Sequence, residues 1–300
     1  MEKLCEGRVA IVTGAGRGIG REYVLMLAAH GAKVVVNDLG GARDGVGASA
    51  GPAQDVVEEI RKAGGEAIAN ANDVSEFSGA AEMIAKAVSA FGRLDVVVNN
   101  AGILRDRMLV NMTEAEWDAV IKVHLKGTFG PAHHAAAYWR ERVKQGERVD
   151  ARLINTTSVS GIYGNAGQSN YGAAKAGIAA FTVIAALELQ RYGITVNAIA
   201  PGALTRMTED LGMGRGSEEE KARLHPRWIA PIVTWLASTQ SSHVTGRVFE
   251  ASGEVFAVAE GWHRGPTAPP VGDPNEIGPI VDRLVGTARK NAGMNGRDLD

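Results

Sequence analysis

Cysteine is nearly absent from this chain of 300 residues, in which Cys5 is the only one. A single thiol cannot form a disulfide within the chain, which is typical of proteins from a reducing compartment and favours a cytoplasmic location. The sequence around Cys5 offers no convincing histidine or cationic setting that would activate a thiol. We therefore expect no nucleophilic role for Cys5.

An excess of charge of one sign is also lacking, and so are long apolar runs. The formal net charge of −2 at pH 7 gives no electrostatic footprint for nucleic acid or an anionic membrane. No stretch approaches the roughly 18 uninterrupted apolar residues that a membrane span needs. The N-terminus has no signal-peptide pattern. We expect a small-molecule substrate, with neither nucleic acid nor a membrane as a partner.

Short apolar runs alternate with helical segments along most of the chain. Residues 33–37 (K-V-V-V-N) and 95–99 (D-V-V-V-N) are typical of buried parallel strands. The expected strands are 8–13, 33–37, 66–70, 95–99, 152–157, 195–200 and 247–250. A long helix is expected from 114 to 144, with a bend near Gly130 and Pro131. The alternation predicts an α/β fold with a Rossmann-type, doubly wound parallel sheet.

The domain organisation predicted is a single domain over residues 1–262, followed by a C-terminal arm over 263–300. Glycine and proline are frequent from 265 to 279, and a last helix is expected over 280–290. Within the domain, a loop over about 203–225 carries Met207, Leu211 and Met213. Flexible apolar side chains there would suit a lid over an acyl chain. A mobile surface loop is an equally good interpretation.

The first strand ends in T-G-A-G-R-G-I-G, residues 13–20, and a helix follows at once. Glycine permits a tight turn, close approach of the backbone to a pyrophosphate, and packing of the helix on the strand. The helix N-terminus then offers free N–H groups and a partial positive charge. This context predicts a dinucleotide site. The residues expected there are Gly14, Gly16, Arg17, Gly18, Ile19 and Gly20.

The second strand is followed by Asp38, 18 residues after Gly20. A carboxylate at this point accepts hydrogen bonds from the adenosine ribose hydroxyls and repels a 2′-phosphate, so we predict NAD rather than NADP. Arg17 weakens this preference, because a cation in the turn could meet that phosphate.

Tyr171 and Lys175 lie four residues apart on a predicted helix and therefore share a face. This pair alone is poor evidence of catalysis. Ser158, however, sits just beyond the fifth strand, and ligands of such sheets bind beyond the carboxyl ends of the strands. The combination predicts a catalytic site that moves a hydride and a proton between a secondary alcohol and a ketone.

The chemistry of these three side chains assigns each a role. A phenol has a pKa near 10 and is a poor base at neutral pH. The ammonium of Lys175 is expected to lower the pKa of Tyr171 by about 1–3 units, so that Tyr171 can exchange the alcohol proton. Lys175 can also hold the nicotinamide ribose. Ser158 is expected to orient the reacting oxygen by a hydrogen bond.

These motifs together resemble the short-chain dehydrogenase/reductase family over about residues 7–255. Further matching strings are N-D-V-S at 72–75, N-N-A-G at 99–102, Y-G-A-A-K at 171–175 and N-A-I-A-P-G at 197–202. The resemblance implies that the oligomer is a tetramer or dimer, with long helices pairing across a two-fold axis. It also implies contacts to the cofactor from Asp73, Val74, Asn100, Ala101, Gly102, Pro201, Gly202 and Thr205.

One subgroup is more similar still: the (3R)-hydroxyacyl-CoA dehydrogenase domains of multifunctional β-oxidation enzymes, also described among 17β-hydroxysteroid dehydrogenases. The shared strings include V-V-V-N-D-L-G-G, N-N-A-G-I-L-R-D-R and S-G-I-Y-G-N-A-G-Q. The resemblance implies an acyl-CoA or steroid-type substrate. Within these 300 residues we expect no counterpart of the hydratase and carrier domains of those enzymes.

His124 stands where many family members have a catalytic Asn that holds a water of the proton relay. The subgroup also tends to carry His there, so we count His124 as a catalytic candidate, with a core or interface histidine as the alternative. A histidine titrates near neutral pH, which leaves the relay geometry open.

Other residues receive a structural interpretation. Adjacent His133 and His134 do not share a helix face, so no metal site is expected. Trp117, Tyr138 and Trp139 are expected in the core or at a subunit interface. Lys221, Arg223 and Arg227 could meet CoA phosphates, but a solvated charged segment is favoured. Two other functions stay open: a broad ketone/alcohol reductase of the same fold, and a dinucleotide-binding sensor without chemistry.

Overall fold

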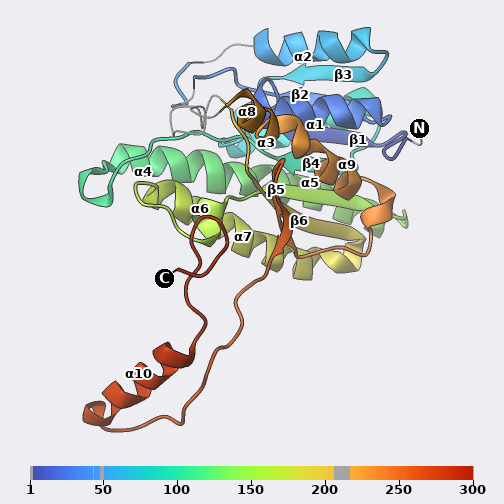
Figure 1. Cartoon of the computed structure of the whole chain (residues 1–300). Helices are drawn as coiled ribbons and strands as arrows, with labels where there is room; N and C mark the ends of the chain where they lie inside the picture. The colour runs from blue at the N-terminus through green and yellow to red at the C-terminus, as the bar shows by residue number, and fades with distance from the viewer. Residues whose placement is uncertain (1–2, 43, 48–50, 206–216, 300) are drawn as a thin grey trace.

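The computed structural model describes residues 3–42, 44–47, 51–205 and 217–299. Its centre is an eight-stranded sheet in the order β3-β2-β1-β4-β5-β6-β7-β8, shown in Figure 1. β1 to β7 run parallel and β8 is antiparallel to β7. The predicted Rossmann-type fold is therefore confirmed. The strands are Val9–Thr13, Lys33–Asn37, Glu66–Asn70, Val96–Asn99, Ala151–Thr156, Ile194–Pro201, Val248–Ala251 and Phe256–Ala259.

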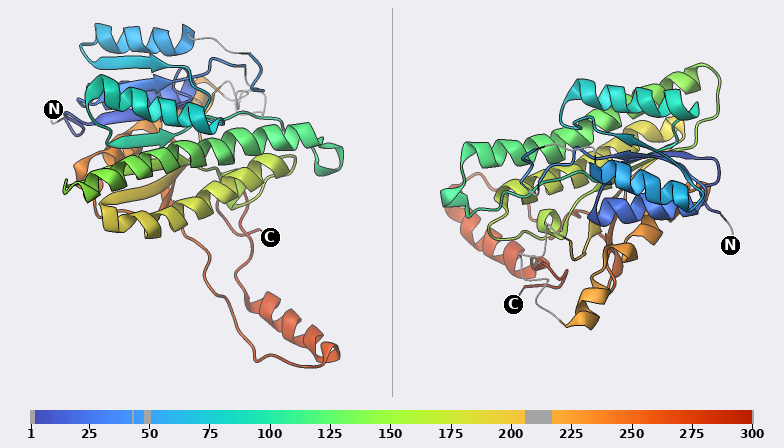
Figure 2. Two further views of the ribbon diagram at one scale, coloured as in Figure 1. Left: turned by 180° about the vertical axis from the view of Figure 1, so that it is seen from behind. Right: turned by 90° about the horizontal axis from the view of Figure 1, so that it is seen from above.

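Helices cover both faces of the sheet (Figure 2). In β1, Ala10 and Val12 pack in the core under α1 (Gly18–Ala29), α2 (Gly51–Lys62) and α9 (Ala230–Ala237). Val9 and Ile11 point to the opposite core. That core is covered by α3 (Phe77–Phe91), α5 (Gly127–Lys144) and α7 (Ser169–Leu189). Both faces of the strand are buried, which explains why its sequence is continuously apolar rather than alternating.

The long predicted helix has its irregularity in a different place. α4 (Glu114–Ile121) passes into a π-helical segment, Lys122–Lys126, before α5 begins. Pro131 lies inside α5. The bend expected near Gly130 and Pro131 stays a prediction, and the observed change in hydrogen-bond pattern lies one turn or more earlier. Short π-helical segments are frequent at functional sites.

The topology places the site at the carboxyl ends of the central strands. β1 lies between β2 and β4, and the chain order reverses there. This reversal opens a crevice beyond the ends of β1 and β4, the usual ligand position in such sheets. Two short helices near that edge are α6 (Val159–Ile162) and α8 (Glu218–Arg223). Met207, Leu211 and Met213 of the expected lid lie outside the described residues.

Beyond β8 the chain leaves the body as an arm (Figures 1 and 2). It carries α10 (Ile277–Thr287) at its far end, three residues earlier than the sequence predicts, and then returns toward the body. β8 was missed by the sequence analysis. The extent of the domain, 1–262, stays a prediction.

Candidate active site

The glycine turn between β1 and α1 can be built only from glycine at two of its positions. Gly14 and Gly18 have φ of +64° and +54°. A Cβ on Gly14 would lie 2.8 Å from Cα of Ala101, and one on Gly20 would lie 2.3 Å from the carbonyl oxygen of Gly14. The turn therefore has no room for side chains at these positions, which leaves its backbone accessible to a ligand.

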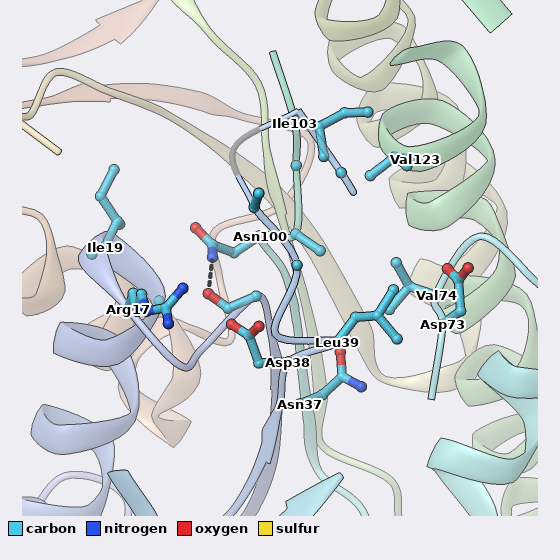
Figure 3. A pocket seen from close by; sticks show the side chains of 18 of the residues that line it. Arg17, Ile19, Asn37, Asp38, Leu39, Asp73, Val74, Asn100, Ile103 and Val123 are labelled. Carbon is cyan, nitrogen blue, oxygen red and sulfur yellow. Dashed lines mark hydrogen bonds between the residues drawn. The ribbon is translucent and has the colours of Figure 1, made fainter. Parts of the chain in front are cut away.

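The turn is fastened to the end of β4 by polar groups. Nδ2 of Asn100 donates to the carbonyl oxygens of Thr13 (2.9 Å) and Gly14 (3.1 Å), as Figure 3 shows in part. Oγ1 of Thr13 accepts hydrogen bonds from the backbone N–H groups of Asn100 and Ala101. Asn100 was predicted as a cofactor contact. The structural role of Thr13 was missed, although it opens the glycine motif.

Asp38 is held against the turn at the end of β2. Its Oδ2 accepts the N–H of Gly16 at 2.8 Å and its Oδ1 accepts the N–H of Gly40 at 2.7 Å. A carboxylate offers about four acceptor positions, so ribose hydroxyls can still bind. A Cβ on Gly16 would meet Oδ2 at 2.8 Å, which explains the second glycine of the motif.

A cleft of about 270 Å³ runs along these elements (Figure 3). At one end lies the start of α1, where Arg17 is exposed and no acidic residue occupies the first turn. The N-terminus of this helix has free N–H groups and a partial positive charge, and both suit a pyrophosphate. Most of the residues that were predicted to contact the cofactor line this cleft: Gly14, Arg17, Gly18, Ile19, Gly20, Asp38, Asp73, Val74, Asn100, Ala101, Gly102 and Thr205.

Some expected contacts lie off the cleft wall, and some lining residues were missed. Gly16 backs Asp38. Pro201 ends β6, and Gly202 follows it and donates its N–H to the carbonyl oxygen of Ala251. Tyr171 and Lys175, also expected to contact the cofactor, do not line the cleft either. The lining residues missed are Asn37, Leu39, Gly41, Ala42, Gly45, Asn72, Ile103 and Val123. Several belong to the glycine-rich stretch after β2, for which the sequence predicts no contact to the cofactor beyond Asp38.

Ser158, Tyr171 and Lys175 converge beyond the end of β5. Ser158 caps α6 and accepts the N–H of Ser160 at 3.1 Å, and its hydroxyl also hydrogen-bonds to Tyr171. Nζ of Lys175 lies 5.5 Å from the centre of the Tyr171 ring. It donates to the carbonyl oxygen of Thr156 at 2.6 Å. The structure thus brings together the three side chains that were predicted to exchange a hydride and a proton with an alcohol.

Burial dominates the protonation of this group. It raises the pKa of Tyr171 to about 12, while the Ser158 hydrogen bond lowers it and Asp106 raises it further. Burial also lowers the pKa of Lys175 to about 7. The expected lowering of the Tyr171 pKa by Lys175 was therefore wrong for the chain alone. A lysine with this pKa is only partly charged at neutral pH, and removal from water outweighs its attraction for a phenolate.

His124 sits in the π-helical segment and contacts Tyr171 edge-to-face, with ring centres 5.1 Å apart. Its Nε2 lies 3.1 Å from the backbone nitrogen and 2.7 Å from the carbonyl oxygen of Ile103. Burial and then Lys175 lower the pKa of His124 to about 3. The expected titration near neutral pH was wrong, because the ring is buried and stays neutral.

A second set of side chains holds the start of α7. Nδ2 of Asn170, which is fully buried, donates to the carbonyl oxygens of Arg105 (3.0 Å) and Glu116 (3.2 Å). Its Oδ1 accepts the N–H of Tyr171 at 2.7 Å. Gln168 donates to Oδ2 of Asp106 at 2.7 Å. These residues fix Tyr171 relative to the loop after β4, and the sequence analysis missed them.

The remaining candidates have structural contacts. His134 lies against Phe77, and no group of three or more potential metal ligands occurs in the described part of the chain. Lys221 and Arg223 form ion pairs with Glu218 and Glu219. Trp139 is buried. The helix Ser169–Tyr192 is apolar and long enough to span a membrane by composition, but it carries the candidate residues Tyr171 and Lys175 and packs on β5 and β6.

Fold and site together define an oxidoreductase with a dinucleotide cleft. Residues 8–215 match the family described as short chain dehydrogenase, and the chain belongs to this family, whose cofactors are NAD or NADP. The resemblance predicted from the motifs is confirmed.

Named relatives refine this placement. The chain is 48% identical to the hydroxyacyl-CoA dehydrogenase ChsB1 of Mycobacterium tuberculosis, covering 81% of this chain and 76% of that protein. It is 47% identical to the peroxisomal multifunctional enzyme type 2 of Drosophila melanogaster, covering 86% of this chain and 40% of the larger protein. A crystal structure of a short chain dehydrogenase from Mycobacterium avium is 51% identical, with a TM-score of 0.87, covering 96% of this chain and 98% of that one.

Proposed function

We propose that this chain is an NAD-dependent 3-hydroxyacyl-CoA dehydrogenase. The observation that carries the proposal is the convergence of Ser158, Tyr171 and Lys175 beside the dinucleotide cleft. Relatives named as hydroxyacyl-CoA dehydrogenases support the substrate class. In the reaction the C–H bond of the secondary alcohol breaks and its O–H proton leaves, giving the 3-oxoacyl thioester. Bound NAD supplies the hydride acceptor.

The roles of the three side chains follow from their positions. Ser158 holds the reacting oxygen and donates to it. Tyr171 accepts the alcohol proton in oxidation and returns it in reduction. Lys175, fixed by Thr156, holds the nicotinamide ribose and passes the proton on. His124 touches Tyr171 but is neutral and tied to Ile103, so we assign it a positioning role. Intact catalytic side chains argue against a dinucleotide sensor without chemistry.

A second candidate is reduction of 3-oxoacyl groups. It is favoured by 38% identity, over 83% of this chain, to the 3-oxoacyl-[acyl-carrier-protein] reductase FabG of Thermotoga maritima. The bonds broken and formed are the same in reverse, so the site chemistry does not change. The carrier of the acyl group and the direction of turnover distinguish the two candidates.

The test is NADH formation by the purified chain with (3R)- and (3S)-hydroxyacyl-CoA and a 17β-hydroxysteroid. We expect turnover of the (3R)-thioester with NAD, reduced at least about 100-fold in Tyr171→Phe. Tyr192→Phe, which changes a tyrosine remote from the site, is the matched control. Turnover of the steroid or of simple alcohols without the thioester would replace the substrate assignment by a broad reductase. Turnover equally fast in Tyr171→Phe would refute the site.

The cofactor preference is tested separately at Asp38. Asp38→Asn keeps the size of the side chain and removes the charge that repels a 2′-phosphate. We expect the ratio of NADP to NAD affinity to rise at least about tenfold. Asp44→Asn, in the same loop and exposed, should leave the ratio unchanged. Preference for NADP in the unaltered chain would show that Arg17 outweighs Asp38.

A further inference from the structure

The glycine-rich stretch that follows β2, described at residues 39–42 and 44–47, forms one wall of the cleft. Its lining residues are Leu39, Gly41, Ala42 and Gly45, while Ile103 lines the cleft from the segment that follows β4. Figure 3 labels Leu39 and Ile103. Since β1 lies between β2 and β4 in the sheet, any contact between these two segments spans the end of β1, where the glycine turn faces the cleft.

Two contacts join the segments on either side of β1. Nε of Arg105 donates to the backbone carbonyl oxygen of Asp44 at 3.0 Å. A Cβ placed on Gly45 would lie 3.2 Å from Cγ2 of Ile103, so the backbone of the stretch runs directly against that side chain. Because the acceptor is a backbone carbonyl, the Arg105 contact does not depend on the side chain at position 44.

The glycine-rich stretch is exposed and gains little from burial. None of its described residues is buried. Its tip turns back on itself, and the N–H of Ala42 donates to the carbonyl oxygen of Val46 at 2.8 Å. Glycine loses more conformational freedom on ordering than any other residue. A single hydrogen bond from outside the stretch therefore has a large effect on how often the stretch occupies this position.

Arg105 is a firm anchor, because its own backbone is fixed. Its carbonyl oxygen accepts a hydrogen bond from Nδ2 of Asn170 at 3.0 Å. Two residues further on, the N–H of Arg107 donates to the carbonyl oxygen of Gly167 at 2.8 Å. The segment after β4 is thus tied to the loop before α7 and to α7 itself. The hydrogen bond from Arg105 consequently restrains the glycine-rich stretch.

We propose that Arg105 is a positioning residue for the dinucleotide. It holds the glycine-rich stretch against Ile103, across the end of β1, and thereby slows the release of bound cofactor. Arg105 itself does not line the cleft, so it acts through the stretch and not on the cofactor. The proposal rests on the NAD dependence proposed above and is independent of the acyl-CoA substrate.

The first test measures release of NADH from the full-length chain by stopped-flow fluorescence. Arg105→Met keeps the aliphatic stem and removes the donor. We expect the dissociation rate constant to rise at least about fivefold, because a charge-assisted hydrogen bond to the stretch is lost. The association rate constant should change less than about twofold. A dissociation rate constant within about twofold of the wild-type value would overturn the proposal.

The matched control is Arg148→Met. Arg148 is an exposed arginine just before β5, at the edge of the sheet opposite the cleft. Its removal should leave both rate constants within about twofold of the wild-type values. Thermal unfolding checks that both variants fold.

The second test approaches the same contact from the stretch. Gly45→Ala adds a Cβ at a φ of +87° and against Ile103, so it displaces the stretch and leaves Arg105 intact. Gly64→Ala, at a φ of +86° with nothing within 4 Å of its Cβ, controls for backbone strain alone. Gly45→Ala should raise the dissociation rate constant at least about fivefold above that of Gly64→Ala. Equal values in these two variants would refute the proposal, even if Arg105→Met did not fold.

The double variant separates action through the stretch from direct contact with the cofactor. If Arg105 acts through the stretch, Arg105→Met with Gly45→Ala should release NADH no more than about twofold faster than the faster single variant. Effects that multiply would mean that Arg105 acts independently of the stretch, and would overturn the proposal.

These measurements use NADH alone, so they are separable from the substrate assignment. A wild-type chain that binds NADH but turns over no hydroxyacyl-CoA would refute the proposed function and leave the comparison of rate constants valid. A wild-type chain that binds only NADPH would refute the NAD preference, and the same rate constants are then compared with NADPH.

Discussion

At the scale of single residues, burial sets the charge at the site more than pairing does. Tyr171 lies against both Lys175 and His124, yet for each of the three the largest cause of its pKa shift is removal from water. The sequence predicted which groups meet, because motif spacing carries that information. It could not predict their protonation, which depends on how completely the surrounding elements exclude water.

His124 gives the chain a stability that depends on pH. Its folded pKa of about 3 lies below the ordinary value near 6.5. Between these values the unfolded chain binds a proton that the folded chain does not, so the unfolding free energy falls as the pH falls. From pH 7 to pH 5 this group alone removes about 2 kcal/mol.

The measurement is urea unfolding at pH 7 and pH 5. His124→Asn keeps a donor and an acceptor for Ile103 and cannot titrate, so its loss of stability over this range should be about 2 kcal/mol smaller than that of the wild type. His263→Asn, exposed on the arm, should behave like the wild type. Identical pH dependence in His124→Asn would show that the ring is not held neutral.

At the scale of elements, the start of α7 depends on one amide side chain. Asn170→Ala would leave the partly buried carbonyls of Arg105 and Glu116 and the N–H of Tyr171 without their partner. Each unsatisfied buried group costs about 1–3 kcal/mol. Since some of these groups can regain water, we expect a total loss of about 3 kcal/mol in unfolding free energy, together with a lower kcat.

Thermal unfolding and steady-state kinetics measure the two effects. Asn111→Ala, an exposed asparagine in the segment Leu109–Asn111, is the matched control and should cost less than about 0.5 kcal/mol. If Asn170→Ala lost the expected unfolding free energy but kept its kcat, Asn170 would support the fold without positioning Tyr171.

The elements also show where sequence patterns carry information. The predicted strands β1 to β7 lie within one residue of the observed strands, because fully buried parallel strands are continuous apolar runs. β8 was missed since F-A-V-A is short and lies on an exposed edge. The π-helical segment was missed because a local change in the backbone hydrogen-bond pattern does not alter the amino-acid composition of the helix. Asn170 and Gln168 carry no motif of their own, so their contacts across the loop after β4 emerged only from the fold.

At the scale of the whole molecule, the cleft and the proposed catalytic residues all precede the arm. Every cleft residue lies between Gly14 and Thr205, and the last strand ends at Ala259. Because no described side chain after Ala251 is buried, the arm adds little to the stability of one subunit. We therefore predict that a chain ending at residue 262 still folds, unfolds cooperatively and loses no more than about 2 kcal/mol.

Two properties of the shortened chain separate the body from the arm. NADH binding, followed by fluorescence, should stay within about threefold of the full-length value, because no contact to the dinucleotide is removed. Its urea unfolding should remain a single cooperative transition, since every described buried side chain lies at or before Ala251. If the shortened chain instead failed to fold, the domain would extend through residue 300, and the return of the chain past Tyr163, whose hydroxyl lies 3.3 Å from where a Cβ on Gly296 would sit, would be part of the core architecture.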